Sequence, residues 1–244
     1  MNRIIGAVAF ILAFFGVGYL FEAGIIPSPF SRTFTEDEIS ATLQDESEMF
    51  VIMKSEFPEA YGELLTELAD EQGDGNDALA TAGFAFVTNF RRENADLLLA
   101  ADDGQLRAVV RATAATHEAA RKFLGEEVCG NFAVQGYPAI QDQADDPVVV
   151  TAMEQQGTTL FRAFASGKST EPREVASSQD WTAVIDTPNR SPEEARRLDL
   201  VAATDPQAEG YCSALIWFFE FLADADGEAA ERTRASLARD IAAS

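Results

Sequence analysis

Residues 212–222 read CSALIWFFEFL, the most apolar helical stretch downstream of the N-terminal segment. The stretch follows Asp205-Pro206, a pair typical of helix N-termini because aspartate caps the first turn and proline fits the first helical position. We therefore predict a helix that opens at this pair and runs to Leu222.

Further helix start signals lie upstream of this stretch. Thr35-Glu36-Asp37-Glu38 and Ser191-Pro192-Glu193-Glu194 have the form of capping boxes, and Asp146-Pro147 is a second aspartate-proline pair. Apolar residues follow at helical spacing, and the sequence has no alternating run long enough for a strand. It therefore predicts a mainly α fold with one irregular multi-helix bundle.

Two segments have a less regular pattern. The interval 125–146 contains three glycines and a proline without a sustained apolar period, so we expect an unusually long loop there. The last helix, expected at 228–242, has mixed charges that predict an exposed face.

The N-terminal segment is a candidate membrane anchor. Residues 4–21 read IIGAVAFILAFFGVGYLF without a charge. At about 1.5 Å per residue this helix would span roughly 27 Å, close to the hydrocarbon core of a bilayer. A cleaved signal peptide is the alternative, but no suitably placed pair of small residues follows. We predict an uncleaved signal-anchor at 1–26, a linker at 27–34 and an acidic all-helical soluble domain at 35–244.

The charges beside this segment predict its orientation. Arg3 and the N-terminal amine precede it, and Arg32 alone follows, which gives a small bias toward a cytoplasmic N-terminus. We therefore expect a single-pass protein of a bacterial inner membrane with its C-terminal domain in the periplasm.

Composition excludes several classes of site. With 18 Lys plus Arg against 41 Asp plus Glu, the net charge of -23 excludes non-specific binding to nucleic acid. One histidine and two cysteines exclude zinc fingers and cysteine-ligated clusters. The acidic residues are scattered and lack the spacing of a calcium loop. We expect no metal and no cofactor.

The two cysteines are most simply a disulfide. If the domain is exported, Cys129 and Cys212 lie in an oxidising compartment. Their bond would close a loop of roughly eighty residues and contribute about 4.5 kcal/mol on the chain-entropy model. Two buried thiols are the alternative, mainly if the domain faces the cytoplasm.

The sequence contains no recognisable catalytic constellation. His117 lacks the second histidine of a zinc protease, because Arg121 stands one turn later, and it lacks the Glu-x-x-His spacing of a di-iron site. We interpret His117 as structural. Glu220 interrupts an aromatic run, where a buried carboxylate would be a candidate for chemistry, although an exposed edge of the helix is the simpler interpretation.

Three functions follow as hypotheses. The preferred one is a binding or scaffold protein of the bacterial envelope, without catalysis, that works with an envelope partner. The second is a lipid or small apolar ligand-binding domain, with a cavity near the loop and the apolar helix. The third is an enzyme that uses a buried carboxylate. No feature specifies an oligomeric state. The candidate ligand-binding residues are Trp217, Phe219, Glu220 and Phe221, with Phe123 as a further wall of the cavity.

Overall fold

The chain forms a mainly α-helical domain. A computed structural model describes residues 34–71, 76–140, 146–186 and 190–243, and no strand occurs among them. The predicted anchor at 1–26 and residues 27–33 of the predicted linker lie outside the described residues. In the described part, no helix combines the length and hydropathy that a membrane crossing requires.

The helices follow one another with short connections, apart from an extended segment between α8 and α9. Their bounds are α2 (Glu36–Glu46), α3 (Glu48–Glu56), α4 (Pro58–Glu71), α5 (Asn76–Asn94), η4 (Ala95–Leu99), α6 (Asp103–Leu124), α7 (Glu126–Gln135), η5 (Tyr137–Ala139), α8 (Pro147–Gly167), α9 (Ser178–Ile185), α10 (Pro192–Ala203), α11 (Tyr211–Asp224) and α12 (Glu228–Ala243).

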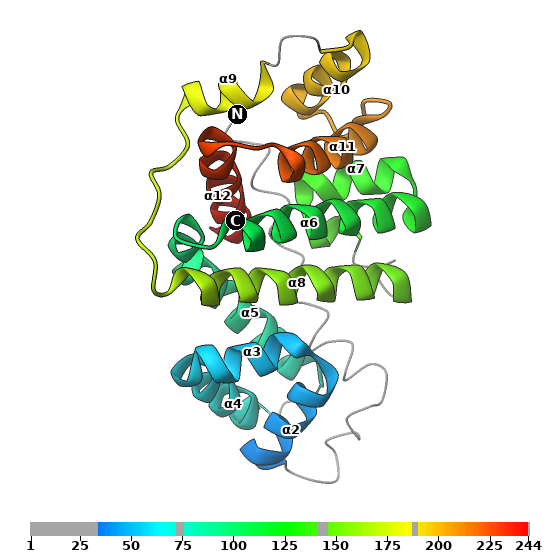
Figure 1. Ribbon diagram of the computed structural model, residues 1–244. Coiled ribbons are helices and arrows are strands. Elements are labelled where there is room, and N and C mark those ends of the chain that lie inside the picture. The colour runs from blue at the N-terminus through cyan, green and yellow to red at the C-terminus, as the bar shows by residue number, and fades with distance from the viewer. Residues whose placement is uncertain (1–33, 72–75, 141–145, 187–189, 244) are drawn as a thin grey trace.

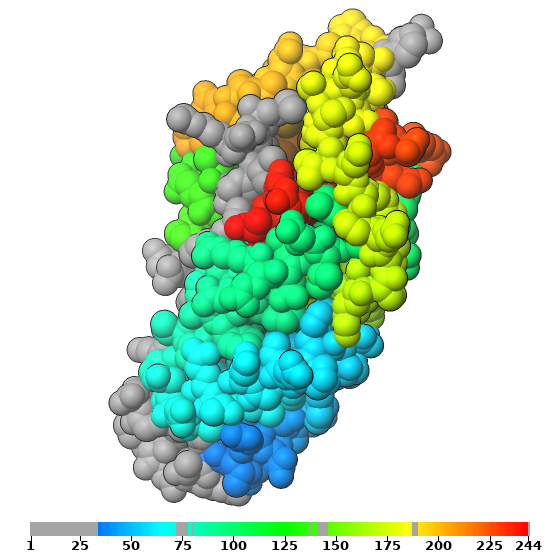
Figure 2. Space-filling view, turned by 90° about the vertical axis from the view of Figure 1, so that its left-hand side faces the viewer, coloured from blue at the N-terminus to red at the C-terminus, as the bar shows by residue number. Residues whose placement is uncertain are grey.

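The long helices α6 and α8 lie side by side across the middle of the molecule, and α11 packs on another side of α6 (Figure 1). Helices α2 to α4 form one end of an elongated body, and α9 and α10 form the other (Figure 2). Two clusters of buried apolar side chains fill this body. One joins α2–α6, η4, α8 and α12, and the other joins α6–α12.

The predicted capping signals are confirmed at three helix starts. Thr35 and Ser191 form capping boxes with Glu38 and Glu194, respectively. The carboxylate of Asp146 accepts hydrogen bonds from the first turn of α8. These local bonds satisfy backbone N–H groups that a helix leaves without partners, so they fix the helix starts independently of tertiary packing.

The predicted long loop at 125–146 is wrong over its first half, which forms α7. Cys129, Phe132 and Ala133 are spaced as on one helix face, and all three are buried. A helix of this length has too few turns to show a sustained apolar period, which explains why the sequence pattern missed it.

The predicted helix start at Asp205-Pro206 is also wrong. The carboxylate of Asp205 accepts from the N–H of Gln207, but the chain turns, and α11 begins only after Gly210 at φ 82°. The turn places the Pro206 carbonyl against α7, where a Cβ on Gly130 would lie 2.5 Å from its oxygen. Packing against α7 therefore overrides the local helix signal.

A buried arginine joins three helices, α6, α11 and α12. Arg234 of α12 is fully buried, and its Nε and Nη2 donate to Oδ1 of Asp103, at the start of α6, at 2.8 and 2.6 Å. Its Nη1 donates to the carbonyls of Leu222 and Ala225 at 2.9 and 2.6 Å, where α11 ends. Burial raises the pKa of Asp103, but the bonds and charges of Arg107 and Arg234 outweigh it and hold that pKa below its ordinary value.

This arrangement corrects the expectation of an exposed face on the last helix. Although α12 carries mixed charges, most of its second half is buried, from Thr233 to Ala238 and again at Ile241 and Ala242. Its alanines allow close approach of η4, α6 and α9, and its buried arginine is satisfied by the bonds described above.

Gly167 provides a test of the packing between α8 and η4. A Cβ at this position would lie 2.0 Å from the carbonyl oxygen of Leu97, so Gly167→Ala should lower the free energy of unfolding by at least ~2 kcal/mol. The matched control is Gly62→Ala in α4, where a Cβ meets nothing within 4 Å. The control should raise that free energy by up to ~1 kcal/mol. Urea unfolding followed by far-UV circular dichroism measures both, and equal midpoints would contradict the described contact.

Candidate functional site

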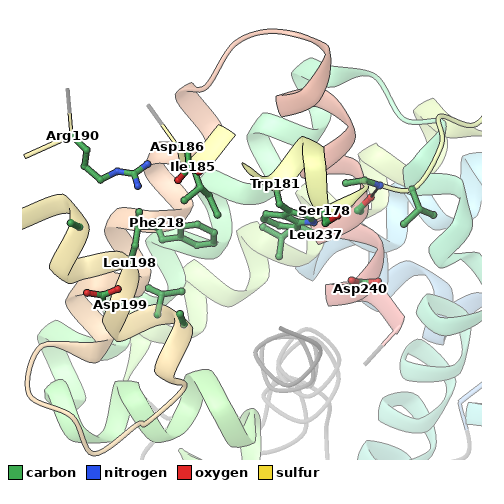
Figure 3. Close-up of a pocket in the computed structure, with 16 residues that line it drawn as sticks. Ser178, Trp181, Ile185, Asp186, Arg190, Leu198, Asp199, Phe218, Leu237 and Asp240 are labelled. Atoms are coloured by element: carbon green, nitrogen blue, oxygen red, sulfur yellow. Dashed lines mark hydrogen bonds between the residues drawn. The ribbon is translucent and has the colours of Figure 1, made fainter. Parts of the chain in front are cut away.

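A cavity of about 540 Å³ opens between α9, α10, α11 and α12. Its wall is mainly apolar and comes from all four helices (Figure 3). A cavity of this size is within the range of small-molecule sites. The large apolar side chains that line it are Trp181, Ile185, Leu198, Val201, Phe218 and Leu237.

The sequence positions these side chains through helical spacing. Trp181 and Ile185 are four residues apart and face the cavity from α9, and both are half-buried. Phe218 and Leu237 form the deeper wall on α11 and α12, with 7% and 5% of their surfaces exposed. The cavity therefore has a buried floor and a partly exposed outer wall.

An ion pair holds α9 against α12. The carboxylate of Asp180 accepts from Nη2 and Nε of Arg232 at 2.6 and 3.1 Å, and it also bonds Ser177 in the capping box that starts α9. The Arg232 hydrogen bonds, followed by those of Ser177, hold the pKa of Asp180 well below its usual range. Asp180 therefore remains ionised and paired at neutral pH.

Hydrogen bonds that involve backbone groups fix the extended segment between α8 and α9. Arg173 donates from Nη1 to the carbonyl of Ala101 at 2.6 Å, and its N–H donates to the carbonyl of Leu99 at 2.9 Å. Closer to α9, the N–H of Ala176 donates to Oγ of Ser236 at 2.7 Å. These bonds set the position of α9 over the cavity.

Charged side chains stand around the cavity. Asp186 and Asp199 are exposed, Asp240 is half-buried, and Arg190 is half-buried with a buried Nη2 atom that has no hydrogen-bond partner in the described part of the chain. Figure 3 places Arg190 and Asp240 at opposite ends, with Phe218 and Trp181 between them. An apolar floor with charged ends suits an amphipathic molecule.

The four residues predicted to bind a ligand do not meet in this cavity. Phe219 is buried in the solid core, Trp217 and Phe221 stack on each other with ring centroids 5.4 Å apart, and Glu220 is exposed. Trp217 and Glu220 line a shallow surface hollow instead. Of the aromatic run, only Phe218 lines the cavity. The predicted wall residue Phe123 is 42% exposed on the surface.

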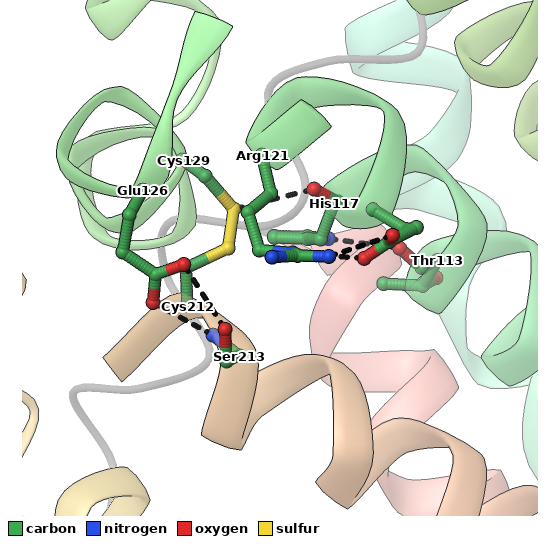
Figure 4. Close-up of a disulfide and its surroundings, with 8 residues drawn as sticks. Thr113, His117, Arg121, Glu126, Cys129, Cys212 and Ser213 are labelled. Carbon is green, nitrogen blue, oxygen red and sulfur yellow. Dashed lines mark hydrogen bonds and ion pairs between the residues drawn. A yellow bond between two sulfur atoms is a disulfide. The ribbon is translucent and has the colours of Figure 1, made fainter. Parts of the chain in front are cut away.

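Cys129 and Cys212 form a disulfide, as predicted, and this bond connects α7 to α11 (Figure 4). The Sγ atoms of Cys129 and Cys212 lie 1.86 Å apart and the Cα atoms 5.8 Å apart. Both residues are fully buried. Beside the disulfide, the Glu126 carboxylate accepts from the N–H and the hydroxyl of Ser213, each at 3.0 Å, which adds a second link between the two helices.

His117 is a structural residue next to this link. It is fully buried, its ring lies 5.1 Å from that of Phe132 and 5.6 Å from that of Phe219, and Nδ1 donates to the Thr113 carbonyl at 2.8 Å. Burial lowers the pKa of His117 to about 4, although the hydrogen bond to Thr113 opposes this shift. The imidazole is therefore neutral near pH 7. Among the described residues, no group of three His, Cys, Asp or Glu is placed to hold a metal ion.

Asp180→Asn tests whether the ion pair holds the outer wall of the cavity. At neutral pH it should lower the hydrogen-exchange protection of the α9 amides several-fold, because it removes the anion that Arg232 and Ser177 bind. A depressed aspartate pKa stabilises the fold above the ordinary value of about 4 and loses that effect as the pH falls below it. Protection in the variant and the wild type should therefore converge in strong acid.

The control for this variant is Asp186→Asn, at the exposed C-terminal end of the same helix. It should leave the protection of α9 unchanged at neutral pH. Equal protection in Asp180→Asn and the wild type would show that the ion pair does not hold α9.

Comparison with known proteins identifies no family for the chain. No protein-family profile matches it, and neither the curated proteins nor the solved structures that were searched give a match. The functional interpretation therefore rests on the cavity and its surroundings.

Proposed function

We propose that this protein binds a small apolar or amphipathic molecule, such as a lipid chain, in the cavity between α9, α10, α11 and α12. The cavity itself is the observation that supports the proposal. Trp181, Ile185 and Leu198 keep part of their apolar surface exposed there. Covering apolar surface is favourable by about 25 cal/mol per Å², so an apolar ligand gains free energy from contact with this wall.

The cavity favours this function over the two other hypotheses. A scaffold needs a surface for a protein partner and does not require an apolar hollow among four helices. The enzyme hypothesis requires a buried carboxylate at Glu220, and that side chain is exposed. Ligand binding gives the cavity a role without a catalytic group.

The proposal places this binding domain on the periplasmic side of a bacterial inner membrane, held by the N-terminal segment as a single-pass anchor. Two observations support it. Residues 4–21 have the length and the lack of charge of a membrane span. The disulfide between Cys129 and Cys212 is typical of exported proteins. An apolar ligand of a tethered domain would then come from the membrane or from an envelope partner.

Ligand binding is testable by fluorescence, because the chain has only two tryptophans and only Trp181 lines the cavity. The full chain, held in phosphatidylcholine nanodiscs, is titrated with 1-octanol in a Trp217→Phe background. We expect a saturable change in the Trp181 emission. The reciprocal Trp181→Phe variant, which keeps Trp217, should show no saturable change, which separates binding from a general effect of the alcohol on the nanodisc.

Two neighbouring exposed alanines of α10 provide a matched pair for the same titration. Ala202 lines the cavity and Ala203 does not. Ala202→Phe should weaken octanol binding because the new ring occupies the space, and Ala203→Phe should leave the binding unchanged. Equal binding in both variants, or no saturable signal in the Trp217→Phe background, would contradict ligand binding in the cavity.

The proposed location is tested by thiol chemistry in intact cells. Cys129 and Cys212 should resist alkylation under denaturing conditions until a reductant is added, and the mature protein should retain residues 1–26 by mass. Alkylation of both thiols by denaturation alone would place the domain in a reducing compartment. A mature mass without residues 1–26 would contradict the anchor.

A further inference from the structure

The charges around the cavity determine which kind of amphipathic molecule it accepts. Three carboxylates and one guanidinium line it, from Asp186, Asp199, Asp240 and Arg190. The lining therefore has a net negative charge, within a protein whose net charge is -23. A cationic ligand gains from this field and an anionic ligand loses.

Arg190 is the single cation of the lining that the structure describes. Figure 3 draws Arg190 and Asp186 on the side of the cavity away from Asp240. Among the described residues, no hydrogen bond reaches the buried Nη2 atom of Arg190. Because Arg190 and Asp240 lie at opposite ends of the cavity, the positive charge of Arg190 is kept apart from a cation that Asp240 would receive.

The carboxylate at the other end, that of Asp240, has no close cation as its partner in the described part of the chain. Among the described residues, Asp240 is paired only with Arg239, at 3.8 Å, and no hydrogen bond reaches its carboxylate. Arg239 is committed elsewhere, since its Nε donates to Asp96 at 2.7 Å. The Asp240 side chain is 36% exposed, and it lies on the cavity side of α12 with Leu237. Burial raises the pKa of Asp240, as expected for a carboxylate without a close cation.

From this arrangement we propose that the ligand carries one ammonium group, which Asp240 receives, while its apolar body lies on Trp181, Phe218 and Leu237. The assignment rests on the proposed function and adds the chemical class of the ligand. The two aromatic rings strengthen it, because the faces of tryptophan and phenylalanine attract a cation that passes over them. A single-chain amine with a hydrocarbon tail is the simplest member of the class.

The test compares three probes with the same chain: octylammonium, 1-octanol and octanoate. Each is titrated against the full chain in phosphatidylcholine nanodiscs with the Trp217→Phe background, and the Trp181 emission is followed. Octylammonium should bind about five- to tenfold more tightly than 1-octanol, and octanoate more weakly than either, because a partly buried ion pair contributes on that scale.

Asp240→Asn should remove the preference for octylammonium and leave the affinity for 1-octanol unchanged. The matched control is Asp45→Asn, which removes the same charge from the exposed end of α2 and does not line the cavity. That control should keep the preference. Because both variants change the net charge equally and use the same nanodiscs, partition of the probe into lipid cancels in the comparison.

Each of the other possible binding results contradicts a specific part of the proposal. Tighter binding of octanoate would place an anionic head group on Arg190 and overturn the ammonium assignment. Equal binding of all three probes would leave apolar ligand binding in place but remove the role of Asp240. Failure of all three probes would overturn both the ammonium assignment and ligand binding.

Discussion

The guanidinium of Arg234 is the constraint on which the second half of the fold depends. Burial of a charged group is unfavourable unless the group is paired and hydrogen-bonded. The Arg234 guanidinium is therefore stable only where the carboxylate of Asp103 on α6 and the carbonyls at the end of α11 come together around it. Three helices are thereby fixed at a single point. The next two turns of α12 carry the cavity residues Ser236, Leu237 and Asp240. Fixing Arg234 therefore also fixes the positions of the cavity floor and of the Asp240 carboxylate.

The sequence predicted what is encoded locally. A capping box or an aspartate-proline pair satisfies the first turn of its own helix, so Ser191 and Asp146 could be interpreted without knowledge of the fold. Asp205-Pro206 carries the same signal but forms a turn against Gly130, which is distant in sequence. Local signals predict a helix start only where tertiary packing does not require a different backbone conformation. Such packing depends on residues distant in sequence, so it could not be predicted from the local pattern.

The cavity was less predictable than the helices because it depends on relative rotation. Phe218 and Phe219 are adjacent in an apolar run, and both are buried, but one faces the cavity and the other faces His117. Helical periodicity defines the angle between them but not which side is left open. The Asp180–Arg232 pair joins residues that are 52 positions apart, so it gave no signal in sequence spacing. The disulfide was predictable because only one pairing exists.

The two sides of the cavity differ in how they are attached to the protein. On one side, α11 is bound covalently to α7 through Cys129 and Cys212, and α12 is fixed by its buried arginine. On the other side, α9 is a single eight-residue helix that follows an extended segment and is held by the Asp180–Arg232 ion pair. Its detachment exposes far less surface than unfolding of the domain, and it therefore costs less free energy. In the proposed function, local opening of this short helix would widen the entrance for a ligand, while the disulfide-linked helices keep the shape of the cavity.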